Sequence, residues 1–211
     1  MKRISSVILC GLMLISGTAS AESAKQQLQS KLSALKSYSA VFAQTVIDAK
    51  GQVLQQATGK IRLLQPNKLF WEVDEPNENV LIADGISLWH VDPFVEQVVA
   101  MDQLAAVSNN PIVLLAQPDS KAWDEYSIAA NESGDKFTVS TSSESSQIEQ
   151  LVFVFDGKTL KALDIIDRQQ QTTQLIFDDI KQGAPISTAI FKFSLPDGYT
   201  LDDQRNVAAG D

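Results

Sequence analysis

Apolar residues recur along this chain with two different periods, and each period predicts a different kind of element. Near the start, leucines at helical spacing follow a capping box that begins at Ser23, which predicts an amphipathic helix over about Ala24–Ser37. From Tyr38 onwards the period changes to two, because apolar and polar residues alternate in short runs that end at turn residues. The chain is therefore expected to begin with one helix and to continue mainly as β-strands.

The short runs predict one large antiparallel sheet. No helical crossovers separate consecutive runs, and this is typical of antiparallel rather than parallel pairing. About eleven strands are too many for a flat open sheet, so the sheet is expected to curl strongly or to close. After a first strand that begins near Tyr38, the predicted strands run over about 54–65, 68–74, 79–83, 86–91, 95–100, 123–129, 136–141, 148–155, 160–167, 171–180 and 190–195.

One segment interrupts this alternation and is apolar on every side. Weak helical character over 101–109 is followed by Asn110 and Pro111, which are typical of an N-cap and a first helical position. The residues of Ile112–Ala116 are all apolar, and Pro118 then ends the segment. A surface helix would show a polar face, so this predicted helix needs apolar surroundings all round.

The first 21 residues have the pattern of a cleavable secretory signal. A basic start and a short apolar stretch precede the small residues around Ala21, so cleavage is expected before Glu22. The stretch is too short to span a bilayer as a helix. Its removal takes away the only cysteine, Cys10, and leaves residues 22–211 as one exported domain without disulfides.

Charge and composition narrow the function classes. The formal net charge of −9 becomes more negative when the basic leader is removed, and this disfavours nucleic acids and anionic membrane surfaces as partners. The chain has one histidine, His90, and it lacks the spacing of hydrolase, zinc-protease, thiol-redox and P-loop motifs. We therefore expect no catalytic residues, no metal site and no cofactor.

The most informative feature of the predicted strands is their apolar surface. Strand parity places Leu69 and Trp71 on one face of the strand over 68–74, and the segments 80–82 and 151–155 are apolar on both faces. A curved sheet with an apolar concave face and two helices to cover it predicts a lidded hydrophobic cavity. An ordinary packed core accounts for the same residues, and both interpretations stay open at this point.

Several segments resemble the LolA family of periplasmic lipoprotein carriers. Gln65–Trp71 is similar to the family's R-P-N-x-F-x-W region, and Leu81–Trp89 is similar to its L-V-x-D-G-x-x-L-W stretch. Asp92–Gln97 resembles N-P-F-x-x-Q, Pro111–Ala116 resembles the apolar lid helix, and Leu201–Arg205 resembles V-D-D-Q-R. The matches run in order over nearly all of the chain that follows the leader.

The resemblance implies a fold and a function. The fold is an incomplete antiparallel β-barrel of about eleven strands with a helical lid over an apolar cavity. The function is that of a monomeric periplasmic chaperone, which takes acylated lipoproteins from an ATP-driven complex of the inner membrane and delivers them to an outer-membrane acceptor. It uses no nucleotide itself. The alternatives are a carrier or sensor domain for another lipid on the same fold and, from a different class, a periplasmic hydrolase.

The same resemblance singles out candidate site residues. Gln65 stands where family members typically have an arginine that hydrogen-bonds to the lid and holds it shut. Glutamine keeps its N–H donors but loses the charge, so we expect a weaker latch and more reliance on apolar lid contacts. Leu69 is expected near a rim where an introduced charge can reach water. The expected lining of the acyl-chain cavity is Leu32, Leu35, Leu69, Trp71, Leu81, Ile112, Leu114 and Leu115.

Overall fold

A computed structural model of the protein describes residues 23–205 apart from 109, 142 and 145. The predicted signal segment and the expected cleavage site before Glu22 lie outside the described residues. In the part that is described, no helix is both long enough and apolar enough to cross a membrane.

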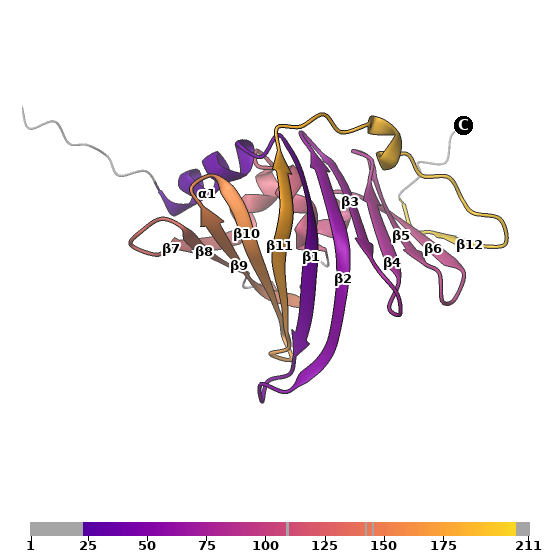
Figure 1. Ribbon diagram of the computed structural model, residues 1–211, viewed down its shortest axis with the longest axis horizontal. Helices are drawn as coiled ribbons and strands as arrows, with labels where there is room; N and C mark the ends of the chain where they lie inside the picture. The colour runs from indigo at the N-terminus through magenta and orange to yellow at the C-terminus, as the bar shows by residue number, and fades with distance from the viewer. Residues whose placement is uncertain (1–22, 109, 142, 145, 206–211) are drawn as a thin grey trace, which may run out of the picture.

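One strongly curved sheet of twelve strands forms the body of the protein (Figure 1). The strand order is β12-β6-β5-β4-β3-β2-β1-β11-β10-β9-β8-β7, so β12 and β7 are its two edges and the barrel stays open. Neighbouring strands are antiparallel except for β12 and β6, which are parallel. The strands are β1 (Ser37–Ile47), β2 (Val53–Leu64), β3 (Lys68–Val73), β4 (Asn79–Ala83), β5 (Ser87–Asp92), β6 (Gln97–Asp102), β7 (Tyr126–Ala130), β8 (Lys136–Thr141), β9 (Ile148–Asp156), β10 (Thr159–Asp167), β11 (Thr172–Gln182) and β12 (Thr200–Asp203).

Helical segments lie on both sides of this sheet. The predicted capping box is present at the start of α1, where the Ser23 hydroxyl accepts from the backbone N–H of Gln26 and the Gln26 side chain accepts from the backbone N–H of Ser23. The connection between β6 and β7 contains three short 3₁₀ helices, and with α1 it covers the concave side. A fourth lies in the C-terminal segment and contacts β3. The helices are α1 (Ala24–Ser33), η1 (Ala105–Ser108), η2 (Pro111–Ala116), η3 (Lys121–Glu125) and η4 (Thr188–Phe191).

The sequence predictions of a mainly β fold and of most strands are confirmed, and two of the strands have the predicted bounds, Asn79–Ala83 and Lys136–Thr141. The first helix is shorter than predicted and ends at Ser33. Lys36, three residues beyond the helix, adopts a φ of +37°, a left-handed conformation that turns the chain just before β1 begins. The apolar segment predicted as a helix is the 3₁₀ helix η2, and Ile112–Ala116 is buried, as its all-round apolarity requires.

The predicted strand over 190–195 is wrong. Phe191 ends η4 and is buried, and Phe193 stacks on Trp89 with ring centroids 4.3 Å apart, so this segment is held by side-chain packing and not by strand pairing. The sequence reading also missed β12, which pairs with β6 farther along the chain. In addition, the strand predicted over 123–129 begins only at Tyr126, because η3 takes up the preceding residues.

Strand alternation gives β3–β6 two apolar faces. On the concave side, Leu69, Trp71 and their neighbours join the main hydrophobic cluster. On the convex side, a second group of buried residues lies outside that cluster, next to the C-terminal segment. The curved sheet thus has an apolar layer on each face, each with its own cover. The convex group is Ile82, Val91, Val98, Ala100 and Phe191.

Candidate functional site

The floor of the candidate site is an apolar row that crosses β1–β4. Leu69 pairs with Leu63 of β2 and Ala83 of β4, and all three side chains lie on the concave face. Two pairs farther along, on the same face, Trp71 is paired with Leu81 and stacks on Phe42 of β1, with ring centroids 4.1 Å apart. Because these positions share one face of adjacent strands, they make a continuous apolar surface.

Gly59 makes the stacking of Phe42 on Trp71 sterically feasible. A Cβ atom at Gly59 would lie 2.2 Å from Phe42 Cζ and 2.2 Å from the backbone oxygen of Glu72. Both distances are far below van der Waals contact, so the aromatic ring occupies the space that a side chain at this position would need. The glycine is therefore part of the site's construction.

The cover contributes apolar residues from two directions. Leu28, Leu32 and Leu35 are fully buried beneath α1 and the turn that follows it. From the other direction η2 contributes residues that are between 0% and 7% exposed. The structure thus brings the expected lining residues into one cluster, with Leu81 packed against its edge, although acyl-chain binding by them stays a prediction. These residues are Leu32, Leu35, Leu69, Trp71, Leu81, Ile112, Leu114 and Leu115.

The expectation that Leu69 lies at a rim is wrong. Leu69 is 0% exposed because Leu63, Ala83 and the cover surround it, so a charge there would be buried without a partner. Leu81 is half-buried and is the lining residue that reaches the open part of the concave face. Beyond it, a hollow of about 850 Å³ is lined by His90, Phe94 and several acidic residues.

The site is closed in this structure. Leu32, Leu35 and Leu69 are 0% exposed and Leu115 is 1% exposed, because floor and cover pack directly on each other. Protein interiors packed in this way leave no room for an acyl chain. A ligand therefore has access to the floor only if α1 or the η1–η3 connection moves away.

Gln65 contacts the cover, and its partner is α1. Its Nε2 donates to the backbone oxygen of Leu32 at 2.7 Å, and its backbone N–H donates to the oxygen of Lys36 at 2.8 Å. Gln182, at the end of β11, donates from Nε2 to the oxygen of Ala34 at 3.0 Å. Two glutamines at the ends of strands on either side of β1 thus hold carbonyl groups at the carboxyl end of α1. Whether Gln65 acts as a latch stays a prediction.

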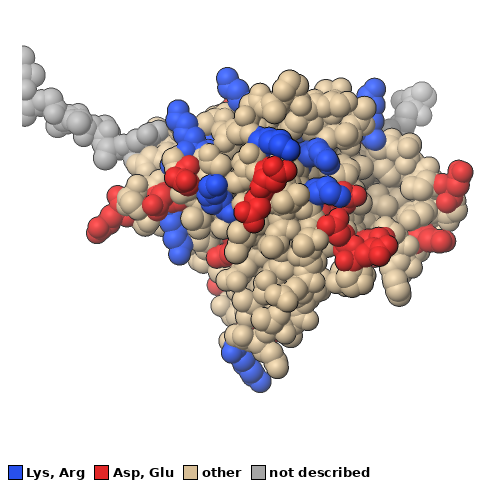
Figure 2. Space-filling view, viewed as in Figure 1, with Lys and Arg blue, Asp and Glu red and all other residues tan. Residues whose placement is uncertain are grey.

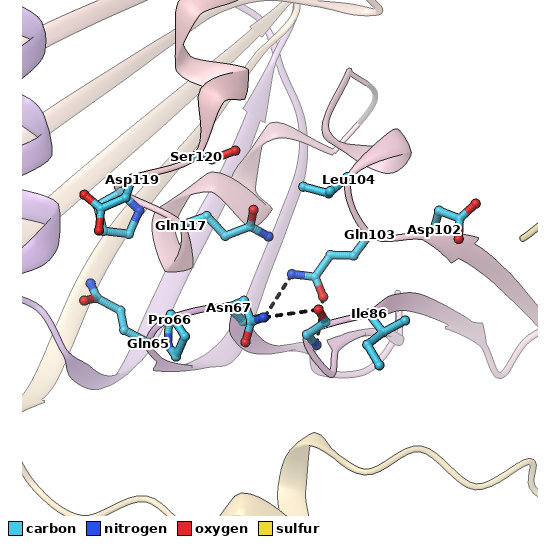
Figure 3. A pocket seen from close by; sticks show the side chains of 12 residues that line it. Gln65, Pro66, Asn67, Ile86, Asp102, Gln103, Leu104, Gln117, Asp119 and Ser120 are labelled. Carbon is cyan, nitrogen blue, oxygen red and sulfur yellow. Dashed lines mark hydrogen bonds between the residues drawn. The ribbon is translucent and has the colours of Figure 1, made fainter. Parts of the chain in front are cut away.

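A second hollow of about 650 Å³ opens beside Gln65 (Figure 3). It separates the β2–β3 turn from the residues that join η2 to η3. Hydrogen bonds brace its sheet side, since Gln103 Nε2 donates to the oxygen of Asn67 at 2.9 Å and Asn67 Nδ2 donates to the oxygen of Gly85 at 3.1 Å. Ile86 is 81% exposed near its mouth. The sheet side of this hollow is therefore rigid and partly apolar.

Polar groups near the site have structural partners. Burial raises the pKa of Asp84, but hydrogen bonds from Trp89 Nε1 and from the backbone N–H groups of Ser87 and Ile86 outweigh it and lower the pKa. Burial lowers the pKa of His90, which lies on the concave face. The described residues contain no group of three or more His, Cys, Asp or Glu that could hold a metal ion.

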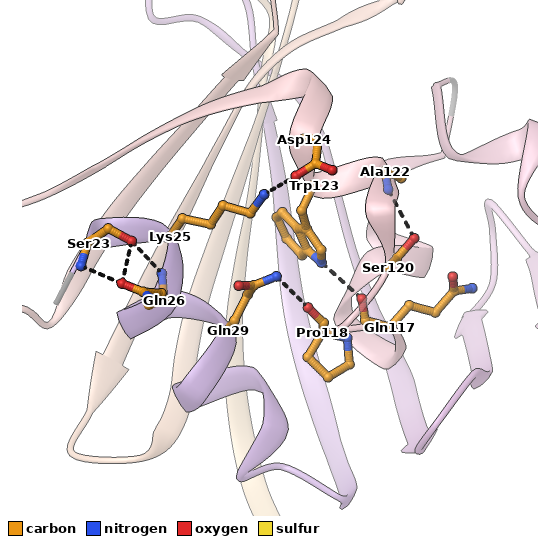
Figure 4. Close-up of polar contacts among 10 residues, drawn as sticks. All are labelled: Ser23, Lys25, Gln26, Gln29, Gln117, Pro118, Ser120, Ala122, Trp123 and Asp124. Atoms are coloured by element: carbon orange, nitrogen blue, oxygen red, sulfur yellow. Dashed lines mark hydrogen bonds and ion pairs between the residues drawn. The ribbon is translucent and has the colours of Figure 1, made fainter.

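Sequence reasoning missed the polar contacts that join α1 to η3 and to the segment before η3 (Figure 4). Lys25 Nζ forms an ion pair with the carboxylate of Asp124, and Gln29 Nε2 donates to the backbone oxygen of Pro118 at 2.9 Å. The ion pair lowers the pKa of Asp124. Lys25 and Gln29 are four residues apart, which places them on one face of α1, and this spacing was the available signal.

Curated relatives resemble the chain over nearly its whole length. An outer-membrane lipoprotein carrier protein of Actinobacillus pleuropneumoniae serotype 7 is 36% identical over 209 residues, covering 97% of each chain. The protein of the same name from Pseudoalteromonas translucida is 34% identical over 208 residues, covering 98% of this chain and 99% of its own. These alignments cover both the sheet and its two covers.

Among solved structures, a DUF1329 family protein from Desulfovibrio piger has a TM-score of 0.50 at 10% identity, covering 80% of this chain and 95% of its own. At that identity the likeness concerns the fold alone. The family model described as "Outer membrane lipoprotein carrier protein LolA" matches residues 33–194, which include the apolar floor, η2 and most of the sheet. The chain belongs to the outer membrane lipoprotein carrier protein LolA family.

Proposed function

We propose that this protein binds the acyl chains of lipoproteins on its concave apolar surface and carries them across the periplasm. Membership of the carrier family supports the function, and the apolar floor under a separate cover is the observation that carries the mechanism. The floor belongs to a continuous sheet, whereas the cover consists of short segments. A cover of this kind can leave the floor without breaking the pairing of the strands.

The physical need for a carrier follows from the chemistry of the cargo. Three acyl chains of about 15 methylenes each, at ~0.8 kcal/mol per buried CH₂, cost on the order of 35 kcal/mol to expose to water. Free diffusion between two membranes is therefore negligible. Carriage involves no bond-making step, so the protein works as a binding protein and not as an enzyme.

Release limits how tightly the site holds its cargo. In the closed state the apolar floor packs against Leu32, Leu35 and η2, so these contacts compete with the cargo for the same surface. Each acyl chain that enters displaces protein contacts, and each that leaves allows them to form again. This competition brings loading and unloading nearer to balance, so that loading draws on outside work.

The proposal includes a route for the protein and its cargo. The chain is exported, and its leader is removed before Glu22. The protein receives acylated lipoproteins from an ATP-driven complex in the inner membrane and delivers them to an outer-membrane acceptor, as the family resemblance implies. Mass analysis of the N-terminus of periplasmic material tests the first step. Retention of Cys10, especially in acylated form, would overturn the export step as proposed.

Copurification tests the carrier function directly. The full chain is expressed with its leader, purified from the periplasm, and analysed by intact-mass spectrometry for bound molecules. Acylated lipoproteins are the expected cargo. Recovery of only free fatty acids or phospholipids would favour a carrier for another lipid, and turnover of esters or glycosides would favour a hydrolase.

A pair of matched variants locates the site. Leu81→Glu places a charge on the half-buried edge of the apolar floor, where the carboxylate reaches water, and should reduce cargo recovery to less than about a tenth. Ile176→Glu places the same charge on the convex face, where the native side chain is 58% exposed, and should leave recovery unchanged. Equal loss in both variants would contradict a concave binding site.

A further inference from the structure

Two sets of polar contacts at the two ends of α1 differ in what they join. At its carboxyl end, α1 is held to the sheet, because Gln65 and Gln182 donate to the backbone oxygens of Leu32 and Ala34. At its amino-terminal half, α1 is held to the β6–β7 connection, because Gln29 donates to Pro118 and Lys25 pairs with Asp124. Only the second set joins two different parts of the cover.

We call the residues Gln117–Ser120, which join η2 to η3, the corner. The hollow of about 650 Å³ separates this corner from Gln65, Pro66 and Asn67 of the β2–β3 turn. Among the residues that the structure describes, no hydrogen bond links the corner to that turn. The corner therefore has space on its sheet side, and its link to α1 passes through the backbone oxygen of Pro118 (Figures 3 and 4).

The corner is internally rigid, so a displacement of Pro118 also displaces η2. Trp123 is fully buried, and its Nε1 donates to the backbone oxygen of Gln117 at 2.9 Å. The Ser120 hydroxyl accepts from the backbone N–H of Ala122 and caps η3. Because η2 ends at Ala116, directly before the corner, a movement of the corner changes the position of η2 over the floor.

We propose that Gln29 and Lys25 form a clasp that keeps the apolar site closed by tying α1 to the corner and η3, while Gln65 and Gln182 fix the other end of α1 as a pivot. This inference rests on the proposed function, and it assigns the closing contact to residues other than the position of the family latch. The left-handed backbone of Lys36 lies beside the pivot, between α1 and β1. Opening then consists of breaking the clasp while the pivot bonds persist.

The clasp is built for reversible breaking. Its ion pair is solvent-accessible, with the Lys25 and Asp124 side chains 33% and 70% exposed, and such pairs are weak and screened by salt. The hydrogen bond from Gln29 joins a neutral amide to a backbone oxygen, which water can replace on both sides once the segments part. Opening therefore leaves no buried charge behind.

The test measures how readily the closed site admits a neutral apolar fluorescent probe, N-phenylnaphthylamine, in the full exported chain. Gln29→Met keeps the length of the side chain and removes the donor, and Lys25→Met removes the ammonium group that pairs with Asp124. Because apparent affinity scales with the open fraction, Gln29→Met should tighten probe binding by about fivefold and Lys25→Met by about twofold. Association rates from stopped-flow mixing should rise by similar factors.

Matched controls share the chemistry but not the location. Lys31 lies on the same helix and donates to the backbone oxygen of Gly157 at 2.6 Å, away from the corner, so Lys31→Met should leave probe binding within the error of the wild type. Gln182→Met removes an amide from the pivot and should change probe affinity less than Gln29→Met does. Added salt should tighten probe binding in the wild type more than in Lys25→Met.

The outcomes separate the clasp from the function on which it rests. If wild type and variants all fail to bind the probe, the apolar site itself fails and the proposed function falls with it. If all bind equally, or if Gln182→Met matches Gln29→Met, the clasp is overturned while the carrier function stands. Should Gln29→Met not fold, the exposed Asp124→Asn must reproduce the Lys25→Met effect, and an unchanged affinity in Asp124→Asn overturns the clasp.

Discussion

The two covers of the open barrel are attached to the sheet by different kinds of contact. Both hide an apolar face of β3–β6, one on the concave side and the other on the convex side. Besides its buried apolar contacts, the concave cover is attached through neutral amides and an exposed ion pair, and it is not part of the sheet. The convex cover ends in β12, which is hydrogen-bonded to β6 as part of the sheet.

Aromatic and charged side chains also anchor the convex cover. Phe191 is buried at the end of η4, and Phe193 stacks on Trp89. Arg205 lies over the same indole, 4.6 Å from its ring, and its guanidinium binds the Asp203 carboxylate through two nitrogens. That interaction lowers the pKa of Asp203 to about 2, so the pair stays ionised at any physiological pH.

The comparison indicates which apolar face of the sheet can exchange its cover for a ligand. A cover that is paired into the sheet and anchored by aromatic residues can leave only by partial unfolding. A cover that is held to the sheet by apolar packing and a few hydrogen bonds, without strand pairing, can leave while the sheet stays intact. Figure 2 shows acidic and basic side chains on both halves of the front face, so the surface charge there does not mark this difference.

The largest expected effect comes from the convex anchor. Phe191→Ala leaves a cavity beneath η4 and should lower the free energy of unfolding by about 3–5 kcal/mol. Urea denaturation followed by circular dichroism measures it. Probe binding to the folded fraction should not increase, because this cover does not gate the concave site. A loss below about 1 kcal/mol would show that the convex cover is as loosely held as the concave one.

Substitutions in the concave cover should change the rate of cargo transfer. Leu114→Ser removes a fully buried apolar contact of η2 and should slow transfer of an acylated lipoprotein to its acceptor by about tenfold or more. Gln65→Leu removes one neutral hydrogen bond at the pivot and should change transfer by less than about threefold. If Gln65→Leu stalls transfer as severely as Leu114→Ser, the polar contact of Gln65 is the true latch.

A smaller effect is expected at the aromatic stack of the convex side. Phe193→Ala removes a half-buried ring from Trp89 and should cost about 1–2 kcal/mol of unfolding free energy. Phe193→Tyr keeps the stack and serves as the control, with a change of less than about 0.5 kcal/mol. Denaturation monitored by tryptophan fluorescence reports both. Equal losses in the two variants would mean that the stack itself adds nothing.

The smallest effect is the pH dependence of the unfolding free energy that arises from His90, which lines the hollow at the open part of the concave face. Burial lowers the pKa of His90 below its ordinary value of 6.5, so the unfolded chain binds a proton more readily than the folded one. The stability this provides is present above pH 6.5 and is lost as the pH falls through the lowered pKa. Urea titrations between pH 7 and 5 should show that slope, and His90→Gln should reduce it. An unchanged slope in His90→Gln would contradict burial of this imidazole.

Local sequence patterns determined most of the sheet and the apolar identity of the site. The apolar run over 79–83 and the alternation over 136–141 predicted the bounds of two strands, because turn residues bound each run. The all-round apolarity of Ile112–Ala116 likewise predicted its burial. These features need no knowledge of which segments meet, and the family motifs added the identity of the fold.

Only the tertiary structure decided how the covers are attached. The contacts of Gln29 with Pro118 and of Lys25 with Asp124 join residues about 90 to 100 positions apart, and no local pattern specifies such partners. The segment over 190–195 was predicted as a strand because its residues do alternate. Its aromatic rings nevertheless pack on the face of the sheet instead of extending its edge. Local spacing fixes which way a side chain points, whereas the global path of the chain decides what it meets.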